Sequence, residues 1–396
     1  MIFSKVISYL AVMGMLANLV LPRVMLGIWF YPSYFISILL MCILVYKLLK
    51  NRGVLKISKS VYLLLFVILS VFLSYSYAVI VLGLNVDRGL LVWEILMFVT
   101  FVPYILYFKY INLTEKEINK VVLLFFGVFV LVGISQIFGL EKAVNLYAYE
   151  AHRESSLSGF RLNLTGTEPN VGSIIASFFL IFFFIRFVTK SEMIYLFLSL
   201  VALFFMLSTQ GRTTIIGSSL ALLLYYFYIS KVRLYKKVLI LVPVLISVVF
   251  LYQYVDVSYL TTGLETLSEG HNNSVNVRLD NVKHAFDSWL RSPFLGWGSY
   301  LEAHGSISNI DSEVALILQR YGLFGLSIII YIIFHVLNST KNHRKSTLGG
   351  FVFIMMISLC FNMLTNAVFY SKQVFSIVVF LIFIGYYLKS NAKSRE

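Results

Sequence analysis

Residues 271–325 read HNNSVNVRLDNVKHAFDSWLRSPFLGWGSYLEAHGSISNIDSEVALILQRYGLFG and form the longest polar interruption in an apolar chain. Apolar residues recur in it at helical spacing, at Leu279, Val282, Phe286 and Trp289. This spacing predicts an amphipathic helix that lies on a bilayer surface. Pro293 ends the pattern, and Gly296 and Gly298 predict a turn before a second helix that begins near Asp311. A folded polar loop between membrane spans is the first place to look for function.

The composition is that of a polytopic membrane protein. Hydrophobic residues make up 59% of the chain, charged residues 13%, and the mean hydropathy is +0.87, whereas soluble proteins carry about 25% charged residues. Apolar runs of about 20 residues can cross a bilayer, so the sequence predicts an all-α fold with twelve transmembrane helices. The runs cover residues 6–22, 25–46, 61–84, 89–108, 121–138, 171–187, 193–208, 213–229, 238–254, 313–337, 349–368 and 374–388.

The net charge of +14 is explained by the distribution of charge along the chain. With the N-terminus inside, the cytoplasmic segments hold 21 of the 32 Lys and Arg residues but only four of the 18 acidic residues. This asymmetry follows the positive-inside rule, so no nucleic-acid partner is required. We therefore expect one membrane domain over residues 1–396, with both termini in the cytoplasm. The loops 139–170 and 253–312 are expected on the outer face.

Few side chains inside the predicted spans are ionisable or reactive. Cys42 and Cys360 both fall within spans, so no disulfide framework or metal site is expected. The first apolar run lacks a cleavage site of small residues and is interpreted as an uncleaved helix. Glu94 is an ionisable residue within a span, which makes it a functional candidate. A structural pairing with Arg88 is the favoured interpretation.

The end of the first outer loop, RLNLTGTEPNVG from Arg161, is the first candidate site. Glu168 and Pro169 precede an apolar run, which predicts a helix start. That structural role is one interpretation. The other is that the free N–H groups and positive dipole end of this helix bind a phosphate, that Arg161 joins them, and that Glu168 serves as a general base.

A second candidate lies in the short connection STQGRTTIIGSS around Arg212, which places this arginine at the outer membrane surface. Anchoring to lipid headgroups is the structural interpretation. Thr214 and Ser218 share a helix face at i and i+4. Small polar residues on one face favour helix packing around a wet cavity, and we therefore favour a functional Arg212.

The main loop adds charged candidates of several kinds. His304 follows a glycine turn and can act as acid, base or phosphate partner, although a lone loop histidine is often incidental. Asp311 stands three residues after Ser308, so a helix start explains it equally well. Arg320 follows on the same helix, close to a break predicted at Gly322. Three further basic residues are interpreted as solvated or facing headgroups, namely Lys283, His284 and Arg291.

Four arginines map to the same membrane face, each beside a loop or at the end of a span. They are Arg161, Arg212, Arg278 and Arg320. Arginine binds phosphate oxygens in a planar, bidentate manner. The sequence has no cluster of acidic residues beside these arginines that would hold a divalent metal. The sequence therefore predicts a metal-free site for a lipid-linked diphosphate.

The chain resembles the O-antigen polymerase and O-antigen ligase superfamily of multi-spanning enzymes. The resemblance rests on four stretches: RLNLTGTEPNVG from Arg161, STQGRTT around Arg212, RLDNVKHAFDSWLRSPFLGWGS from Arg278, and NIDSEVALILQRYGLFG from Asn309. It implies a metal-independent, GT-C-like glycosyltransferase of the bacterial inner membrane, without a cofactor, whose active site faces the periplasm. The donor would be a glycan on undecaprenyl diphosphate, attacked at its anomeric carbon by an acceptor hydroxyl.

Within this resemblance, each candidate residue acquires a role. Arg161, Arg212 and Arg278, with Arg320 less directly, would stabilise the leaving diphosphate. Glu168, His304 or Asp311 would act as the base near the attacking hydroxyl, and the sequence does not choose among them.

Polymerase and ligase differ in the acceptor, which is another lipid-linked repeat unit or lipid A-core. The sequence SNIDSE departs from the His-Asn type motif of ligases at Ile310 and Asp311, which favours a polymerase. A lipid-linked oligosaccharide flippase is the alternative from another class. Flippases usually have two similar halves and short loops. In this sequence the outer loops are unequal in length, and no internal repeat is found. The resemblance also implies a chain-length regulator as partner.

Overall fold

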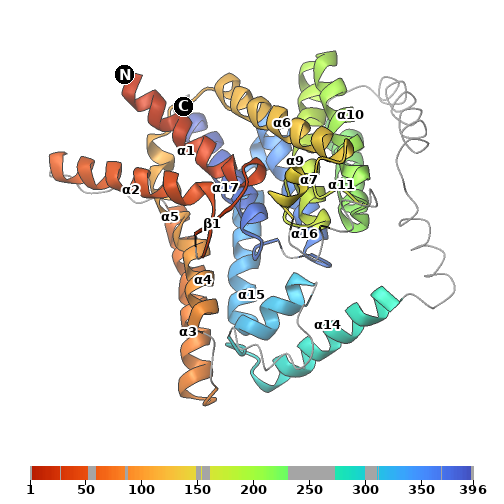
Figure 1. The fold of residues 1–396 in the computed structure, drawn as a ribbon. Helices are drawn as coiled ribbons and strands as arrows, with labels where there is room; N and C mark the ends of the chain where they lie inside the picture. Colours follow the sequence, from red (N-terminus) through yellow and green to blue (C-terminus); the bar gives the residue numbers. More distant parts are fainter. Residues whose placement is uncertain are drawn as a thin grey trace.

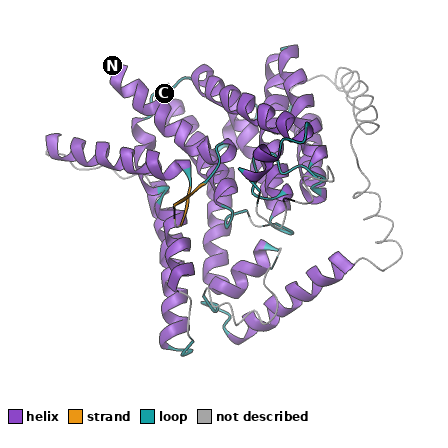
Figure 2. Ribbon diagram, in the orientation of Figure 1, coloured by secondary structure: helices purple, strands orange, loops and turns teal. Residues whose placement is uncertain are grey.

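The computed structural model describes residues 2–26, 28–51, 59–84, 88–148, 153, 161–230, 273–298, 310, 312–366 and 368–393. These residues form helices and one short antiparallel hairpin, with both chain ends at the same end of the molecule (Figures 1 and 2). The elements are α1 (Ile2–Val20), β1 (Val24–Leu26), β2 (Ile28–Phe30), α2 (Pro32–Asn51), α3 (Lys59–Ile80), α4 (Arg88–Val99), α5 (Val102–Tyr107), η1 (Phe108–Tyr110), α6 (Glu115–Ile137), α7 (Glu141–Asn145), α9 (Pro169–Lys190), α10 (Met193–Ser208), α11 (Arg212–Leu224), η2 (Tyr225–Ile229), α14 (Asn273–Arg291), α15 (Glu313–Ser339), η4 (Lys341–His343), α16 (Thr347–Asn362) and α17 (Lys372–Lys393).

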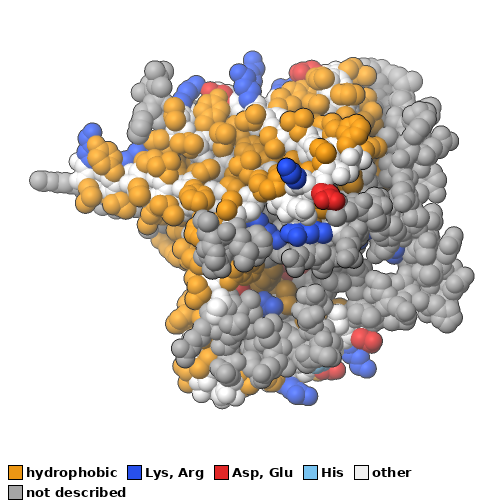
Figure 3. All heavy atoms as spheres, in the orientation of Figure 1, with side chains coloured by type: hydrophobic (Ala, Val, Ile, Leu, Met, Phe, Trp, Pro, Cys, Tyr) orange, Lys and Arg blue, Asp and Glu red, His pale blue; other side chains and the backbone are white. Residues whose placement is uncertain are grey.

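Seven helices among the described residues are long and apolar enough to cross a membrane, and three more are apolar but shorter. Apolar side chains also cover much of the described surface, as expected for contact with lipid (Figure 3). These features support an all-α polytopic membrane protein. Of the twelve predicted spans, residues 238–254 lie outside the described part of the chain. The prediction of one continuous span over residues 25–46 is wrong at its beginning, because the hairpin precedes α2.

Helix α9 forms the centre of the bundle. It is apolar on all sides and buried along nearly its whole length, which is typical of a helix surrounded by other helices. Phe178 packs edge-on against Phe351 of α16 at 5.3 Å between ring centroids, and Phe179 packs against Phe126 of α6 at 5.2 Å. Helices α10, α11 and α17 complete the shell around α9. The N-terminus of α9 is therefore held in place from several directions.

The turn after α14 packs into a kink of α15. Gly296 and Gly322 both adopt left-handed backbone conformations, with φ of +68° and +61°, which confirms the turn and the break predicted there. Trp297 N donates to Gln319 O at 2.8 Å. A Cβ atom at Gly322 would lie 2.4 Å from the carbonyl of Phe294, so only glycine allows the two segments to approach this closely.

Helix α14 is amphipathic, as predicted, but its apolar residues divide between two faces. Ala285 is fully buried against Ala315 and Leu316 of α15. Leu279 and Phe286 remain 62% and 41% exposed. The predicted stripe of Leu279, Val282, Phe286 and Trp289 is therefore not one buried surface, because Val282 packs inward while Leu279 and Phe286 point outward.

The beginning of the predicted first outer loop folds back on the bundle. Short helix α7 is followed by Tyr147, whose hydroxyl donates to Val20 O at the end of α1 at 2.7 Å. Burial raises the pKa of Tyr147 to about 12, so its hydroxyl stays protonated and continues to donate even near pH 10, where an exposed tyrosine is about half ionised.

Candidate functional site

The segment that leads into α9 is a buried loop. Gln136 of α6 donates to Leu164 O at 2.7 Å and accepts from Leu164 N at 2.8 Å. Gln373 of α17 donates to Thr165 O at 2.9 Å and accepts from Thr167 N at 3.1 Å. Buried backbone groups require hydrogen-bond partners, and these two glutamines supply them. The loop is thereby fixed between the two helices.

Arg161 joins this loop to two helix ends. Its Nε donates to Thr209 O at the C-terminal end of α10 at 2.9 Å, and its Nη2 donates to Asn170 Oδ1 in the first turn of α9 at 3.1 Å. Leu162 N also donates to Ser208 O at 3.1 Å. The guanidinium of Arg161 is therefore located at the junction of α9 and α10.

Arg212 begins α11 at the same junction. Its N-cap residue, Gly211, lies so close to the first turn of α9 that a Cβ atom there would be 2.5 Å from Ser173 Oγ. The N-terminus of α11 thus lies beside the N-terminus of α9. Helix N-termini carry partial positive charge and unpaired N–H groups, which favour anions. Two arginines and two such termini therefore meet at this junction.

Two non-glycine residues near the junction adopt the left-handed conformation. Leu164 has φ of +53° and Gln210 has φ of +54°. Such a conformation costs about 1–3 kcal/mol per residue and is enriched at functional sites. The strain is maintained by the glutamine hydrogen bonds at Leu164 and, at Gln210, by its N–H donating to Leu207 O at 2.9 Å.

Glu168 is the N-cap residue of α9, with extended backbone, and Pro169 is the first helical residue. The predicted helix start is confirmed. The Glu168 side chain makes no capping hydrogen bond and is half-buried. A carboxylate is therefore placed beside the arginine junction.

The polar face of α11 packs on α16. Thr214 Oγ1 donates to Asn362 Oδ1 at 2.5 Å, and Ser218 Oγ lies 2.9 Å from Ser358 Oγ. The predicted role of this face in helix packing is confirmed. Thr365 Oγ1, just beyond α16, donates to Thr213 Oγ1 at 2.6 Å. The α11 helix that carries Arg212 is thereby linked to the segment between α16 and α17.

The segment between α16 and α17 also contacts α15, at Glu313 and Arg320. Glu313, the first residue of α15, is fully buried, and its carboxylate accepts from the N–H groups of Val368, Phe369 and Tyr370. The ring of Tyr370 lies below the guanidinium of Arg320, 5.6 Å from its centroid. Tyr370 follows Thr365 by five positions, so the backbone at these two contacts is at most about 18 Å apart.

Arg320 is paired with a buried carboxylate. Its Nη1 lies 2.6 Å from Glu94 Oε1, and Glu94 Oε2 accepts from the Tyr321 hydroxyl at 2.5 Å. Glu94 is fully buried. The sequence suggested Arg88 as its partner, whose side chain lies outside the described residues. Among the described residues, Glu94 pairs with an arginine 226 positions away in the chain.

The remaining candidates are located only in part. Arg278 belongs to α14, but its side chain lies outside the described residues. His304 and Asp311 also lie outside them. The N-cap of α15 is Ser312, whose hydroxyl accepts from Ala315 N. Among the residues that the structure describes, no group of three or more His, Cys, Asp and Glu side chains could hold a metal ion.

Two of the most deeply buried ionisable residues were not predicted from the sequence. One is Glu313. The other is Lys372, whose side chain is nearly fully buried and whose ammonium lies 3.3 Å from the ring centroid of Tyr34 and 5.2 Å from that of Tyr31. Both residues start an apolar run. A charged residue at the beginning of an apolar run is the feature of the sequence that could have identified both of them.

The close contact at Gly211 leads to a stability prediction. We expect Gly211→Ala to destabilise the protein by about 1–3 kcal/mol, because the added methyl group overpacks the junction against Ser173. Gly127→Ala in α6 is the matched control, since a Cβ atom there meets nothing within 4 Å. The melting temperatures of both variants in detergent measure the effect. Equal melting temperatures would contradict the close packing of α9 and α11.

Residues 195–330 match the family model described as O-antigen ligase, which supports the resemblance of this part of the chain to the superfamily of O-antigen ligases and polymerases. The match covers about a third of the chain and runs from α10 into α15. It includes Arg212, Arg278 and Arg320, whereas Arg161 and Glu168 precede it. No curated protein matches the chain.

Proposed function

We propose that this membrane protein is an O-antigen polymerase that joins undecaprenyl-diphosphate-linked repeat units at the periplasmic face of the bacterial inner membrane. Both termini would lie in the cytoplasm. The observation that carries the proposal is the meeting of Arg161, Arg212 and the N-termini of α9 and α11 at one junction. The family match over residues 195–330 supports the same class of reaction.

The proposed reaction is a metal-independent, GT-C-like glycosyl transfer. An acceptor hydroxyl attacks the anomeric carbon of the donor glycan, the bond from that carbon to the diphosphate oxygen breaks, and undecaprenyl diphosphate leaves with the bonding electrons. Arg161 and Arg212 stabilise the negative charge that develops on the leaving oxygen. Arg278 joins them from α14. Arg320, which is already paired with Glu94, positions the kink of α15.

The proton of the attacking hydroxyl requires a base. Glu168 fits this role because its carboxylate lies at the N-terminus of α9, beside the arginine junction. His304 and Asp311 remain alternatives. A base within hydrogen-bond reach of the hydroxyl contributes about 10²- to 10⁴-fold to the rate of such reactions.

The second candidate function is an O-antigen ligase, which would transfer the glycan to lipid A-core. The matched family model carries the description O-antigen ligase, and its match is compatible with both enzymes. The polymerase remains our first choice because the chain departs from the ligase motif at Ile310 and Asp311. A polymerase would also be expected to work with a chain-length regulator.

The surface glycan profile of a deletion strain tests these functions. Lipid A-core capped by a single repeat unit supports a polymerase, because ligation still works. Long chains on the carrier lipid together with bare core indicate a ligase. Repeat units trapped on the cytoplasmic side would contradict both enzymatic functions and leave a flippase. Complementation with the wild-type gene, at a protein level checked by immunoblot, must restore the profile.

A further inference from the structure

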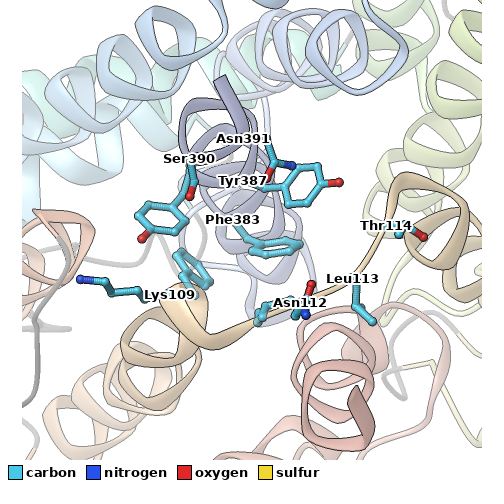
Figure 4. A pocket seen from close by; sticks show the side chains of 11 residues that line it. Lys109, Asn112, Leu113, Thr114, Phe383, Tyr387, Ser390 and Asn391 are labelled. Atoms are coloured by element: carbon cyan, nitrogen blue, oxygen red, sulfur yellow. The ribbon is translucent and has the colours of Figure 1, made fainter. Parts of the chain in front are cut away.

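A cavity of about 350 Å³ opens at the ends of three spans, and its lining contains none of the candidate site residues. The span Leu91–Tyr110 ends there, the span Glu115–Ile137 begins there, and the span Lys372–Asn391 ends there. Figure 4 shows the lining side chains of these segments around the opening. Because span ends mark the membrane surface, this cavity is at the level of lipid headgroups.

The lining changes from polar at the rim to apolar at the floor. Phe108, Leu113 and Phe383 are buried and form the floor, and the rings of Phe108 and Phe383 are 5.5 Å apart. Tyr386 and Tyr387 are half-buried. The exposed rim residues are polar, namely Lys109, Asn112, Thr114, Ser390 and Asn391. Tyrosines between an apolar and a polar layer are typical of a membrane interface.

The charge of the rim is positive. Among the residues that the structure describes, Lys109 is the only charged residue of the lining, and none of them contributes an acidic side chain to it. The acidic residues nearest in sequence are occupied elsewhere, since Glu117 pairs with Lys5 at 2.8 Å and Glu115 with Arg186 at 3.5 Å. Among the described residues, no carboxylate lies within salt-bridge distance of Lys109. Figure 4 shows the Lys109 side chain extended away from the aromatic floor, so its ammonium lies at the outer edge of the opening, where an anion would enter.

We propose that this cavity binds the headgroup of one anionic phospholipid, such as phosphatidylglycerol. Lys109 pairs with the phosphate, and the Ser390 hydroxyl and Asn112 amide donate hydrogen bonds to its oxygens. The aromatic floor receives the glycerol and the first carbons of an acyl chain. A volume of about 350 Å³ lies in the range of small-ligand pockets. The apolar floor favours a lipid over free phosphate, which would leave it unoccupied. This site is independent of the proposed reaction.

Lipid binding to the purified full-length protein in detergent tests the proposal. The measurement is native mass spectrometry during titration with phosphatidylglycerol or phosphatidylcholine. We expect phosphatidylglycerol to bind more tightly, and Lys109→Gln to weaken its binding about fivefold, the contribution typical of one lysine to an anionic lipid. Lys116→Gln is the matched control, because Lys116 is equally exposed in the first turn of α6 but does not line the cavity.

Three outcomes would overturn the proposal. They are equal binding of the two lipids, equal effects of the two lysine variants, and displacement of phosphatidylglycerol by millimolar inorganic phosphate, which would indicate a site for free phosphate. Both lysines are exposed, so neither variant should change the melting temperature, and that measurement shows that the fold is intact.

Discussion

Replacing Arg212 by alanine is expected to slow polymer formation by about 10²- to 10³-fold, the range found when one preorganised donor to a developing oxyanion is removed. Arg212 starts α11 at the junction that Arg161 and the N-terminus of α9 complete. Its loss would remove a charge and a planar pair of donors from the leaving diphosphate. The rate is measured on protein in vesicles supplied with lipid-linked repeat units, with products separated on a gel.

The control for Arg212→Ala is Arg291→Ala. Arg291 is the last residue of α14, and its side chain is exposed. A surface substitution of this kind should leave the rate within about twofold, equivalent to ~0.5 kcal/mol. Arg212→Lys keeps the charge but loses the bidentate geometry, so we expect only a partial loss. A wild-type rate in Arg212→Ala at normal protein level would remove Arg212 from the proposed diphosphate site.

Most helices could be predicted from apolar runs because length and hydropathy are properties of a single segment. The run at 193–208 matches α10 (Met193–Ser208), and the run at 171–187 lies within α9 (Pro169–Lys190). The beginning of the run at 25–46 failed because a hairpin of apolar residues has the same hydropathy as a helix. Only the pairing of β1 with β2, which depends on backbone geometry, distinguishes the two.

Partners at the candidate site depend on contacts between distant segments. The charge pattern placed Arg161 and Arg212 on one face, and the helix start at Pro169 was visible in the sequence. The glutamines that hold the buried loop were not, because Gln136 and Gln373 belong to helices far apart in the chain. Hydropathy predicts which residues enter the membrane but not which ones meet there.

The pairing of Glu94 with Arg320 leads to the largest predicted loss of stability. Glu94→Ala is expected to destabilise the protein by about 3–5 kcal/mol, because it leaves a largely buried guanidinium without its carboxylate. Arg320→Ala should have a similar effect, since it strands the fully buried Glu94. Melting temperatures in detergent measure both. Lys5→Ala is the control, because it breaks a pair whose lysine side chain is 48% exposed and should lower the melting temperature far less.

The double variant Glu94→Ala/Arg320→Ala separates the pairing from substrate binding. Its melting temperature should lie well above those of the single variants, with a coupling energy in the upper part of about 0.5–3 kcal/mol, because no buried charge is left unpaired. If Arg320 only positions the kink at Gly322, the polymerisation rate recovers together with stability, and this is the result we expect. The reason is that the positive charge of Arg320, which a diphosphate would need, is already paired with the Glu94 carboxylate. A double variant that is stable but inactive would instead assign Arg320 to the substrate, together with Arg161 and Arg212.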